Sequence, residues 1–401
     1  MLTNLSLRQF KNFEKASLAL GPFTLLIGTN ASGKSNVRDA FRFLHGISRG
    51  YSLAEIMGEK YVEGGVLQWQ GIRGGTREAT YFGSETFALT AEISDNYKAP
   101  ASYAIEVSPG IRLSKPRVVR ESLRVGNKAY FQYPPADKNS LGVNVPSANP
   151  HRPMLAQIAE QQDWQAQALI DCARESMGGI RSMRFLDLNA EAMRRPSFPG
   201  QTILGDRGEN LSSVLQTICE DSRQKQAIIE WIRELTPMDA CDFDFIPDQM
   251  GRILLTLLEE NGRKTSAYSA SEGTLRFLAM IAALMGPDPA KFYFFEELEN
   301  GLHPARLHLL IRLMERKAFE GNIQIVATTH SPQLLGFLSK KSLDHASLLY
   351  RFPGTSQGRV KRVVDIPDAR RLIAEHGISH LHESGWFEDA MFFLDDVEET
   401  E

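Results

Sequence analysis

Hydrophobic residues follow three different patterns along the chain. Residues 1–9 alternate polar and apolar side chains, whereas residues 23–27 form a continuous apolar run that ends at Gly28. Alternation is typical of a strand with one face in water, and a continuous run is typical of a strand buried on both faces. Residues 34–44 then carry apolar side chains at helical spacing, namely Val37, Ala40, Phe41 and Leu44. The start of the chain therefore predicts strand, strand, glycine-rich turn and helix.

The middle and the end of the chain change period again. Residues 66–131 alternate with period two, which predicts half-buried antiparallel strands, and the proline-rich residues 134–153 predict a loop. Residues 154–240 have the i, i+3, i+4, i+7 spacing of helices, with one helix expected over 154–176. Beyond them the chain alternates strand and helix, with strands expected at 292–295 and 323–328 and helices at 274–285 and 304–317.

Such alternation is typical of a parallel sheet. The sequence thus predicts an α/β fold with a mixed sheet, an antiparallel N-terminal β-subdomain and a helical insertion. The expected segments are an N-terminal lobe over 1–153, the insertion over 154–240 and a C-terminal lobe over 241–401.

Composition limits the classes of partner and the cellular compartment that we expect for this protein. The 401 residues are 42% hydrophobic and carry a net charge of −4, which disfavours a chain coated with basic surface for nucleic acid. The three cysteines show no C-x-x-C spacing, as expected of reduced thiols. No apolar run reaches the roughly 18 residues of a membrane span, and residues 1–9 do not resemble a signal peptide. We therefore expect a cytoplasmic protein without a membrane partner.

Residues 28–35, GTNASGKS, match the phosphate-loop motif G-x-x-x-x-G-K-[ST] in full. The glycines permit the turns that direct backbone N–H groups at a phosphate, and the following helix directs its positive end at the same anion. Lys34 is expected to neutralise the β- and γ-phosphates of ATP, and Ser35 to coordinate Mg²⁺. The alternative is a chance glycine-rich turn. The incomplete motif at residues 262–265 lacks the first glycine and is interpreted as a polar turn. The expected nucleotide-binding residues here are Gly28, Asn30, Ala31, Ser32, Gly33, Lys34, Ser35 and Asn36.

Two carboxylates follow the apolar strand 292–295 directly. Ligand sites in parallel sheets lie at the carboxyl ends of the strands. Glu296 is therefore expected to hold Mg²⁺, and Glu297 to orient or deprotonate the attacking water. His330 follows the strand 323–328 at the same edge and is expected to contact the γ-phosphate or the water. The alternatives are solvated acids and a structural histidine.

In this order, the motifs resemble ABC-type ATPase heads of the SMC and RecF kind. More closely, they resemble stand-alone bacterial AAA-family ATPases related to the OLD nuclease ATPase and to abortive-infection and toxin–antitoxin systems. Residues 5–13, with Lys11 and Asn12, resemble the opening strand that touches the nucleotide. Residues 269–274 are similar to the ABC signature, 296–304 to Walker B with the D-loop, and 328–332 to the H-loop.

The resemblance implies a homodimer in which two protomers enclose two ATP molecules. Ser271 and Gly273 would then reach the γ-phosphate bound by the partner, although Ser271 also suits an ordinary helix cap. Glu272, Thr274 and Glu296 differ from the residues that transporters commonly have, and no Q-loop glutamine is evident. Asp187 and Asn189 are the candidate substitutes.

Three functions are compatible with these motifs. The first is an ATP-dependent dimerising switch that regulates a separate effector, in phage defence or a toxin–antitoxin-like system. The second is a RecF/SMC-like DNA-repair or chromosome-maintenance ATPase that clamps DNA. The missing Q-loop glutamine disfavours the third, a transporter subunit. The residues after His330 are too few for a nuclease domain of about 100 residues, and the acids at 395–401 suit a solvated tail. Basic residues that could contact DNA form two clusters, Arg112, Lys115, Arg117 and Arg120, and Arg181, Arg184, Arg194 and Arg195.

Overall fold

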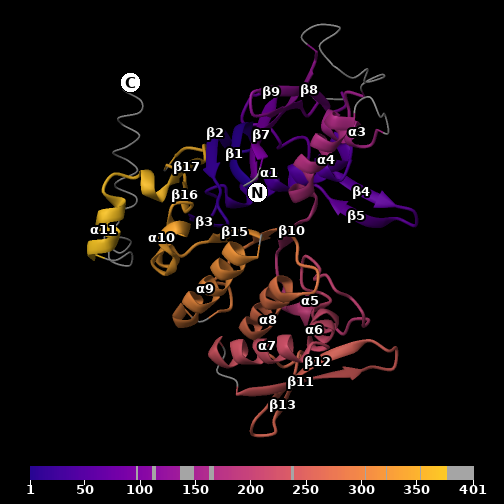
Figure 1. The fold of residues 1–401 in the computed structure, drawn as a ribbon, viewed down its shortest axis with the longest axis vertical. Coiled ribbons are helices and arrows are strands. Elements are labelled where there is room, and N and C mark those ends of the chain that lie inside the picture. The colour runs from indigo at the N-terminus through magenta and orange to yellow at the C-terminus, as the bar shows by residue number, and fades with distance from the viewer. Residues whose placement is uncertain are drawn as a thin grey trace.

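The protein has an upper and a lower lobe that meet at a central sheet (Figure 1). The structure, a computed structural model, describes residues 1–95, 98–110, 114–135, 149–161, 167–235, 239–302, 304–321, 323–352 and 354–376. Arg112 and the acidic residues 395–401 lie outside this part of the chain.

The upper lobe contains a six-stranded antiparallel sheet in the order β2-β1-β6-β7-β8-β9. Its alternate residues are buried, as Phe87, Leu89 and Ala91 illustrate. The antiparallel N-terminal subdomain predicted from the period-two pattern is therefore confirmed. The strands are β1 (Leu2–Phe10), β2 (Phe13–Ala19), β6 (Phe87–Asp95), β7 (Lys98–Ser108), β8 (Arg117–Val125) and β9 (Lys128–Tyr133).

The central sheet has the order β10-β14-β15-β3-β16-β17. Its first five strands are parallel to their neighbours, and β17 is antiparallel to β16, so the sheet is mixed as predicted. The carboxyl ends of β3, β14 and β15 consequently meet at one edge. The strands are β10 (Met183–Leu186), β14 (Phe292–Phe295), β15 (Gln324–Thr329), β3 (Phe23–Gly28), β16 (Ser347–Tyr350) and β17 (Arg359–Arg362).

Helices cover both faces of the central sheet (Figure 1). Those at the upper lobe are α1 (Lys34–Ser48), α2 (Leu53–Met57), α3 (Met154–Ala159) and α4 (Gln167–Arg181). Those below are α5 (Ala190–Met193), α6 (Leu211–Cys219), α7 (Ser222–Leu235), α8 (Glu272–Met285) and α9 (Pro304–Glu320). Further along the chain come the 3₁₀ helices η2 (Pro332–Phe337) and η3 (Val363–Asp365), α10 (Lys340–Leu343) and α11 (Ala369–His376).

Two small sheets complete the fold. The hairpin of β4 (Glu59–Val62) and β5 (Val66–Gln70) projects from the upper lobe, and β11 (Ala240–Pro247), β12 (Ile253–Glu259) and β13 (Lys264–Ser266) form a sheet in the lower lobe. The single helix expected over 154–176 is instead two helices, because α3 ends at Ala159. Segment 154–240 also supplies the edge strand β10, and the three-segment division stays a prediction.

The hydrophobic core lies on both faces of the central sheet. In β3, Leu25 and Ile27 pack in the cluster that extends into the lower lobe, whereas Leu26 packs in the cluster of the upper lobe. This two-sided burial explains the continuous apolar run in the sequence. The three cysteines are free thiols, as expected. Among the described residues, no helix has both the length and the apolar character needed to span a bilayer.

Candidate nucleotide site

The phosphate loop connects β3 to α1, as the motif predicts. Gly33 precedes the helix with φ 111° in the left-handed region, and Ala31 also has a positive φ of 62°. A side chain at Gly28 would lie 2.5 Å from Ser32 Oγ, and one at Gly33 would lie 2.5 Å from the Phe13 ring. Close contacts thus require both the first and the last glycine of the motif, and at Gly33 the backbone conformation requires it as well.

Lys34 closes the loop on itself. Its Nζ donates to the carbonyl oxygens of Gly28 and Thr29, the latter at 2.9 Å, and lies 3.2 Å from Nδ1 of His330. Burial lowers the pKa of the Lys34 amine, and the charges of Glu297 and Glu299 oppose that shift. A buried ammonium that is bonded to carbonyl oxygens is suited to exchange them for phosphate oxygens.

Glu297 lies at the centre of a hydrogen-bonded chain. Its Oε1 is 3.2 Å from Nε2 of His330, and its Oε2 accepts a hydrogen bond from Asn300. A charged lysine can only donate, so Nδ1 of His330 accepts from Lys34 and Nε2–H donates to Glu297. Burial raises the pKa of Glu297, but the hydrogen bonds from His330 and Asn300 outweigh it and leave the pKa below its ordinary value. Glu297 is therefore an ionised carboxylate that can accept a proton.

The backbone fixes the position of this carboxylate. Glu297 has a positive φ of 51°, and its N–H donates to the Thr328 hydroxyl on β15 at 3.0 Å. The His330 N–H donates to Glu299 at 2.5 Å. Strands β14 and β15 therefore hold Glu297 and His330 together at the edge predicted from the sequence.

Glu296 faces a cation that the sequence did not single out. Its carboxylate forms an ion pair with Arg38 on α1. Burial raises the pKa of Glu296, and Arg38 opposes that shift, while the nearby Asp187 adds to it. Asp187 is exposed at the end of β10, whereas Asn189 caps α5 through the Ala192 N–H. Of the two Q-loop candidates, Asp187 thus lies near Glu296, whereas Asn189 serves as a helix cap.

The opening strand contacts the site through Asn12. Its Oδ1 accepts from Nδ2 of Asn36 at 2.7 Å, which ties the turn after β1 to helix α1. Nζ of Lys11 lies 3.5 Å from the fully buried Asp39 instead of at the phosphate loop. Arg73 donates to Asp39 at 3.1 Å and to Asn36 at 3.1 Å.

Sequence reasoning missed Arg38, Asp39 and Arg73. One signal existed for Arg38, because it lies four residues after Lys34 and so on the same face of α1. No local signal marks Arg73, which reaches the site from a distant loop.

The signature-like residues form the start of α8. Ser271 is its N-cap and accepts from the Thr274 N–H at 3.2 Å, so the predicted cap is present. A side chain at Gly273 would overlap the backbone carbonyl of Gly301. The signature turn is therefore packed tightly against the D-loop of its own chain.

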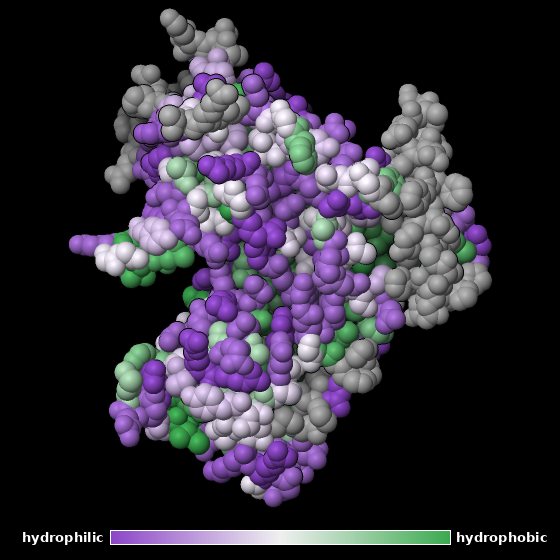
Figure 2. Space-filling view, turned by 180° about the vertical axis from the view of Figure 1, so that it is seen from behind, coloured by the Kyte–Doolittle hydropathy of each residue, from purple (hydrophilic) through white to green (hydrophobic). Residues whose placement is uncertain are grey.

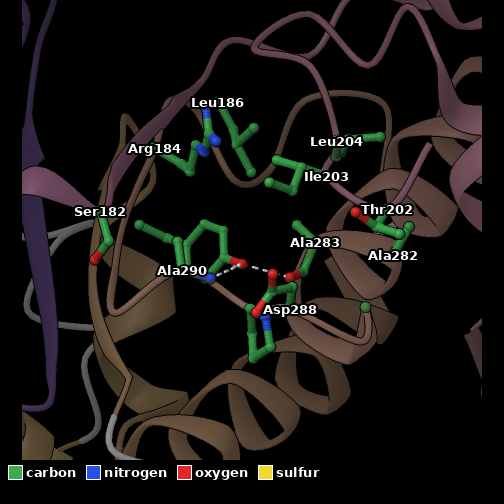
Figure 3. Close-up of a pocket in the computed structure, with 13 residues that line it drawn as sticks. Ser182, Arg184, Leu186, Thr202, Ile203, Leu204, Ala282, Ala283, Asp288 and Ala290 are labelled. Atoms are coloured by element: carbon green, nitrogen blue, oxygen red, sulfur yellow. Dashed lines mark hydrogen bonds between the residues drawn. The ribbon is translucent and has the colours of Figure 1, made fainter.

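A separate pocket of about 200 Å³ lies between β10, the end of α8 and the segment 202–204 (Figure 3). Arg184 and Leu186 line one side, Ile203 and Leu204 face them, and Asp288 lies at the other end (Figure 3). None of the predicted nucleotide-site residues lines it.

The two basic clusters are partly neutralised. Arg120 lies 3.8 Å from Glu106, and Arg194 pairs with Glu191 at 2.6 Å.

Comparison with known proteins bears on this site. A model of the family described as "AAA domain, putative AbiEii toxin, Type IV TA system" matches residues 23–336. An "ATP/GTP phosphatase" of Helicobacter pylori is 32% identical over 88 residues, which span 20% of this chain and 23% of that protein. The chain thus matches less than a quarter of the length of this relative.

Solved SMC heads resemble the chain at low identity. An SMC head bound to the C-terminal winged-helix domain of ScpA has a TM-score of 0.48 at 15% identity, covering 90% of this chain and 96% of that one. The Pyrococcus furiosus SMC head bound to the C-terminal domain of ScpA has a TM-score of 0.49 at 13% identity, with coverages of 93% and 98%. The Thermotoga maritima SMC head has a TM-score of 0.43 at 13% identity, with coverages of 90% and 98%. Likenesses this distant assign no partner.

The family match includes the phosphate loop, the signature-like turn, Glu296, Glu297 and His330. It confirms the resemblance and the ATPase class predicted from the motifs. The chain belongs to the AAA-domain family of putative AbiEii toxins from type IV toxin–antitoxin systems.

Proposed function

We propose that the protein binds ATP, hydrolyses it with Mg²⁺, dimerises head to head on ATP and thereby regulates a separate effector. The observation that carries the proposal is the continuous chain from Lys34 through His330 to Glu297. It joins the residue expected at the phosphates to the residue expected at the water. If these three residues only stabilised the fold, their hydrogen bonds would not need to end at the lysine of the phosphate loop.

Each residue then has a distinct task. Lys34 exchanges its carbonyl partners for phosphate oxygens, and the backbone N–H groups of residues 31–36 surround the same anion. Glu297 orients the attacking water and accepts its proton. His330 holds Glu297 in place through Nε2–H, and its Nδ1 accepts from Lys34. Asn12 and Asn36 position the loop from the side.

The donor set fits a magnesium ion. The Ser35 hydroxyl and the Glu296 carboxylate are hard oxygen ligands of the kind Mg²⁺ prefers. Among the described residues, no group of three or more His, Cys, Asp or Glu could hold a metal by itself. That is compatible with a site that uses two protein oxygens and borrows the rest from phosphates and water. Bound Mg²⁺ would neutralise charge on the phosphate oxygens. Arg38 must release Glu296 for the ion to bind.

Dimerisation would complete the site. Ser271 and Gly273 lie at the positive end of α8, which suits contact with a phosphate bound by a second copy. Family membership supports a role in a toxin–antitoxin-like system. The proposal extends this role to phage defence and to an effector that is encoded separately. The alternative is a RecF/SMC-like ATPase that clamps DNA, and it predicts that dimers need a DNA duplex.

Nucleotide binding and hydrolysis by two variants test the chemistry. Lys34→Ala should lose ATP binding, whereas Lys15→Ala, an exposed lysine on β2, should retain it. Glu297→Gln should still bind ATP but hydrolyse it about a hundredfold or more slowly, the usual loss when a general base is removed. Glu14→Gln is the matched control. Unchanged ATP affinity in Lys34→Ala would refute the phosphate-loop assignment, and near-normal turnover in Glu297→Gln would place the base elsewhere.

A further inference from the structure

Two hairpins project from the same side of the molecule, one from each lobe (Figure 1). The upper one, residues 59–70 of β4 and β5, is here called the hairpin arm. Four of its apolar side chains are solvent-exposed, with exposed fractions of 56% for Tyr61, 40% for Val62, 62% for Val66 and 45% for Leu67. Surface apolar residues are usually scattered, so four within seven positions mark a contact surface.

The lower hairpin joins β11 to β12 and carries a second apolar group. The lower patch consists of Phe198, Ile246 and Met250, with exposed fractions of 55%, 46% and 65%. Two backbone hydrogen bonds between Ser197 and Ile253, at 3.0 and 2.8 Å, fix Phe198 beside this hairpin. Figure 2 shows apolar side chains on the projecting hairpin and on the lower lobe along one side of the molecule.

We propose that the hairpin arm of one copy docks on the lower patch of a second copy in the ATP-bound dimer. The inference rests on the proposed function and adds a contact to it. A two-fold axis beside the two projections places the hairpin arm of each copy against the lower lobe of the other copy. This single symmetry operation covers the hairpin arm and the lower patch of both copies.

Charge supports the same pairing. The arm carries exposed Glu59 and Glu63, while its Lys60 is already paired with Glu55 at 3.2 Å. The lower patch is flanked by exposed Arg195, and its Arg252 pairs with Asp248 within the hairpin. The acidic arm therefore meets the exposed Arg195 beside the lower patch, whereas arm-to-arm contact would bring like charges together, and this difference favours the proposed pairing.

The arm is also connected to the phosphate-loop helix. Arg42 on α1 donates to the Gln70 carbonyl at 2.6 Å, and its guanidinium lies 4.9 Å from the centre of the Trp69 ring. Just beyond the arm, Arg73 donates to Asn36 in the first turn of α1. A shift of α1 on nucleotide binding is thus transmitted to the arm, which explains why docking would depend on ATP.

Cysteine cross-linking between two differently tagged copies tests the contact. Both copies carry Glu297→Gln, to hold ATP, and Cys241→Ser, to remove the exposed native thiol. One copy has Val66→Cys and the other Met250→Cys. We expect an intermolecular disulfide that forms with ATP and not without it. The control replaces Met250→Cys by Phe319→Cys, a partly exposed residue on α9, and should give no such product.

A second measurement needs no new cysteine. Val62→Ser combined with Leu67→Ser should raise the dimer dissociation constant about tenfold or more, because truncating a central apolar contact typically costs that much. Gln68→Ser, an exposed polar change on the same strand, should leave it unchanged. ATP affinity should be the same in all three proteins.

The outcomes separate the two proposals. A nucleotide-dependent dimer that neither forms the Val66–Met250 disulfide nor weakens in the double variant would overturn the docking and leave the switch intact. A monomer under every condition would overturn the switch and the docking together.

Discussion

Gly33→Ala should damage both the stability and the nucleotide affinity of the protein. Gly33 has φ 111° and ψ 4°, and placing a residue with a Cβ in the left-handed region costs about 1–2 kcal/mol. The new Cβ would lie 2.5 Å from the Phe13 ring and 3.0 Å from Asn12 Oδ1. Phe13 is fully buried and cannot move away freely, so overpacking adds about 1–3 kcal/mol.

The expected loss in the free energy of unfolding is therefore about 2–5 kcal/mol, the sum of the strain and overpacking ranges. Gly200→Ala separates the two causes, because Gly200 has φ 84° but no heavy atom within 4 Å of an added Cβ. It should cost only the strain, about 1–2 kcal/mol, and leave ATP affinity unchanged. Urea unfolding and ATP titration of both variants provide the comparison. Equal stability losses, with ATP binding intact in Gly33→Ala, would refute the account of the loop.

Two further changes test other parts of the structure. Ser271→Arg should leave ATP affinity unchanged but block ATP-dependent dimerisation, since it places a bulky cation at the surface expected to face the partner's nucleotide; a variant that still dimerises would leave Ser271 as a helix cap alone. Burial raises the pKa of Glu121 from 4.5 to about 7, although the N–H groups of Met154 and Leu155 and the Tyr103 hydroxyl donate to it. Because the folded-state pKa is the higher one, the stability that Glu121 contributes is complete below about pH 4.5 and falls as pH rises through 7, by about 3 kcal/mol in all. Urea unfolding between about pH 5 and about pH 8 should show this decline in the wild type, and the decline should be smaller in Glu121→Gln. If the free energies of unfolding of the two proteins change in parallel with pH, the raised pKa assigned to Glu121 is contradicted.

Local patterns predicted the elements of the site well. The run 292–295 is buried on both faces, so its length and its end at Glu296 follow from hydrophobicity alone. The phosphate loop is equally local, since its glycines, its lysine and its helix are consecutive. Strand pairing then brings Glu297 and His330 together because β14 and β15 are parallel neighbours.

Contacts between distant segments could not be predicted in the same way. Arg73 and Asp39 are 34 residues apart, and nothing in their local sequence indicates that they pair. The tight packing of Gly273 on Gly301 depends on how α8 meets the D-loop. For the helix expected over 154–176, a local signal was present but misleading. The helical spacing of apolar residues continues beyond Ala159, where α3 ends.

The mass in solution of Glu297→Gln, measured with and without ATP and Mg²⁺, tests the central claim most directly. The account predicts a monomer without nucleotide and a dimer with it, in the absence of any nucleic acid. Dimers that require a short DNA duplex would favour the DNA clamp instead. A monomer under every condition would contradict the composite site and the switch built on it.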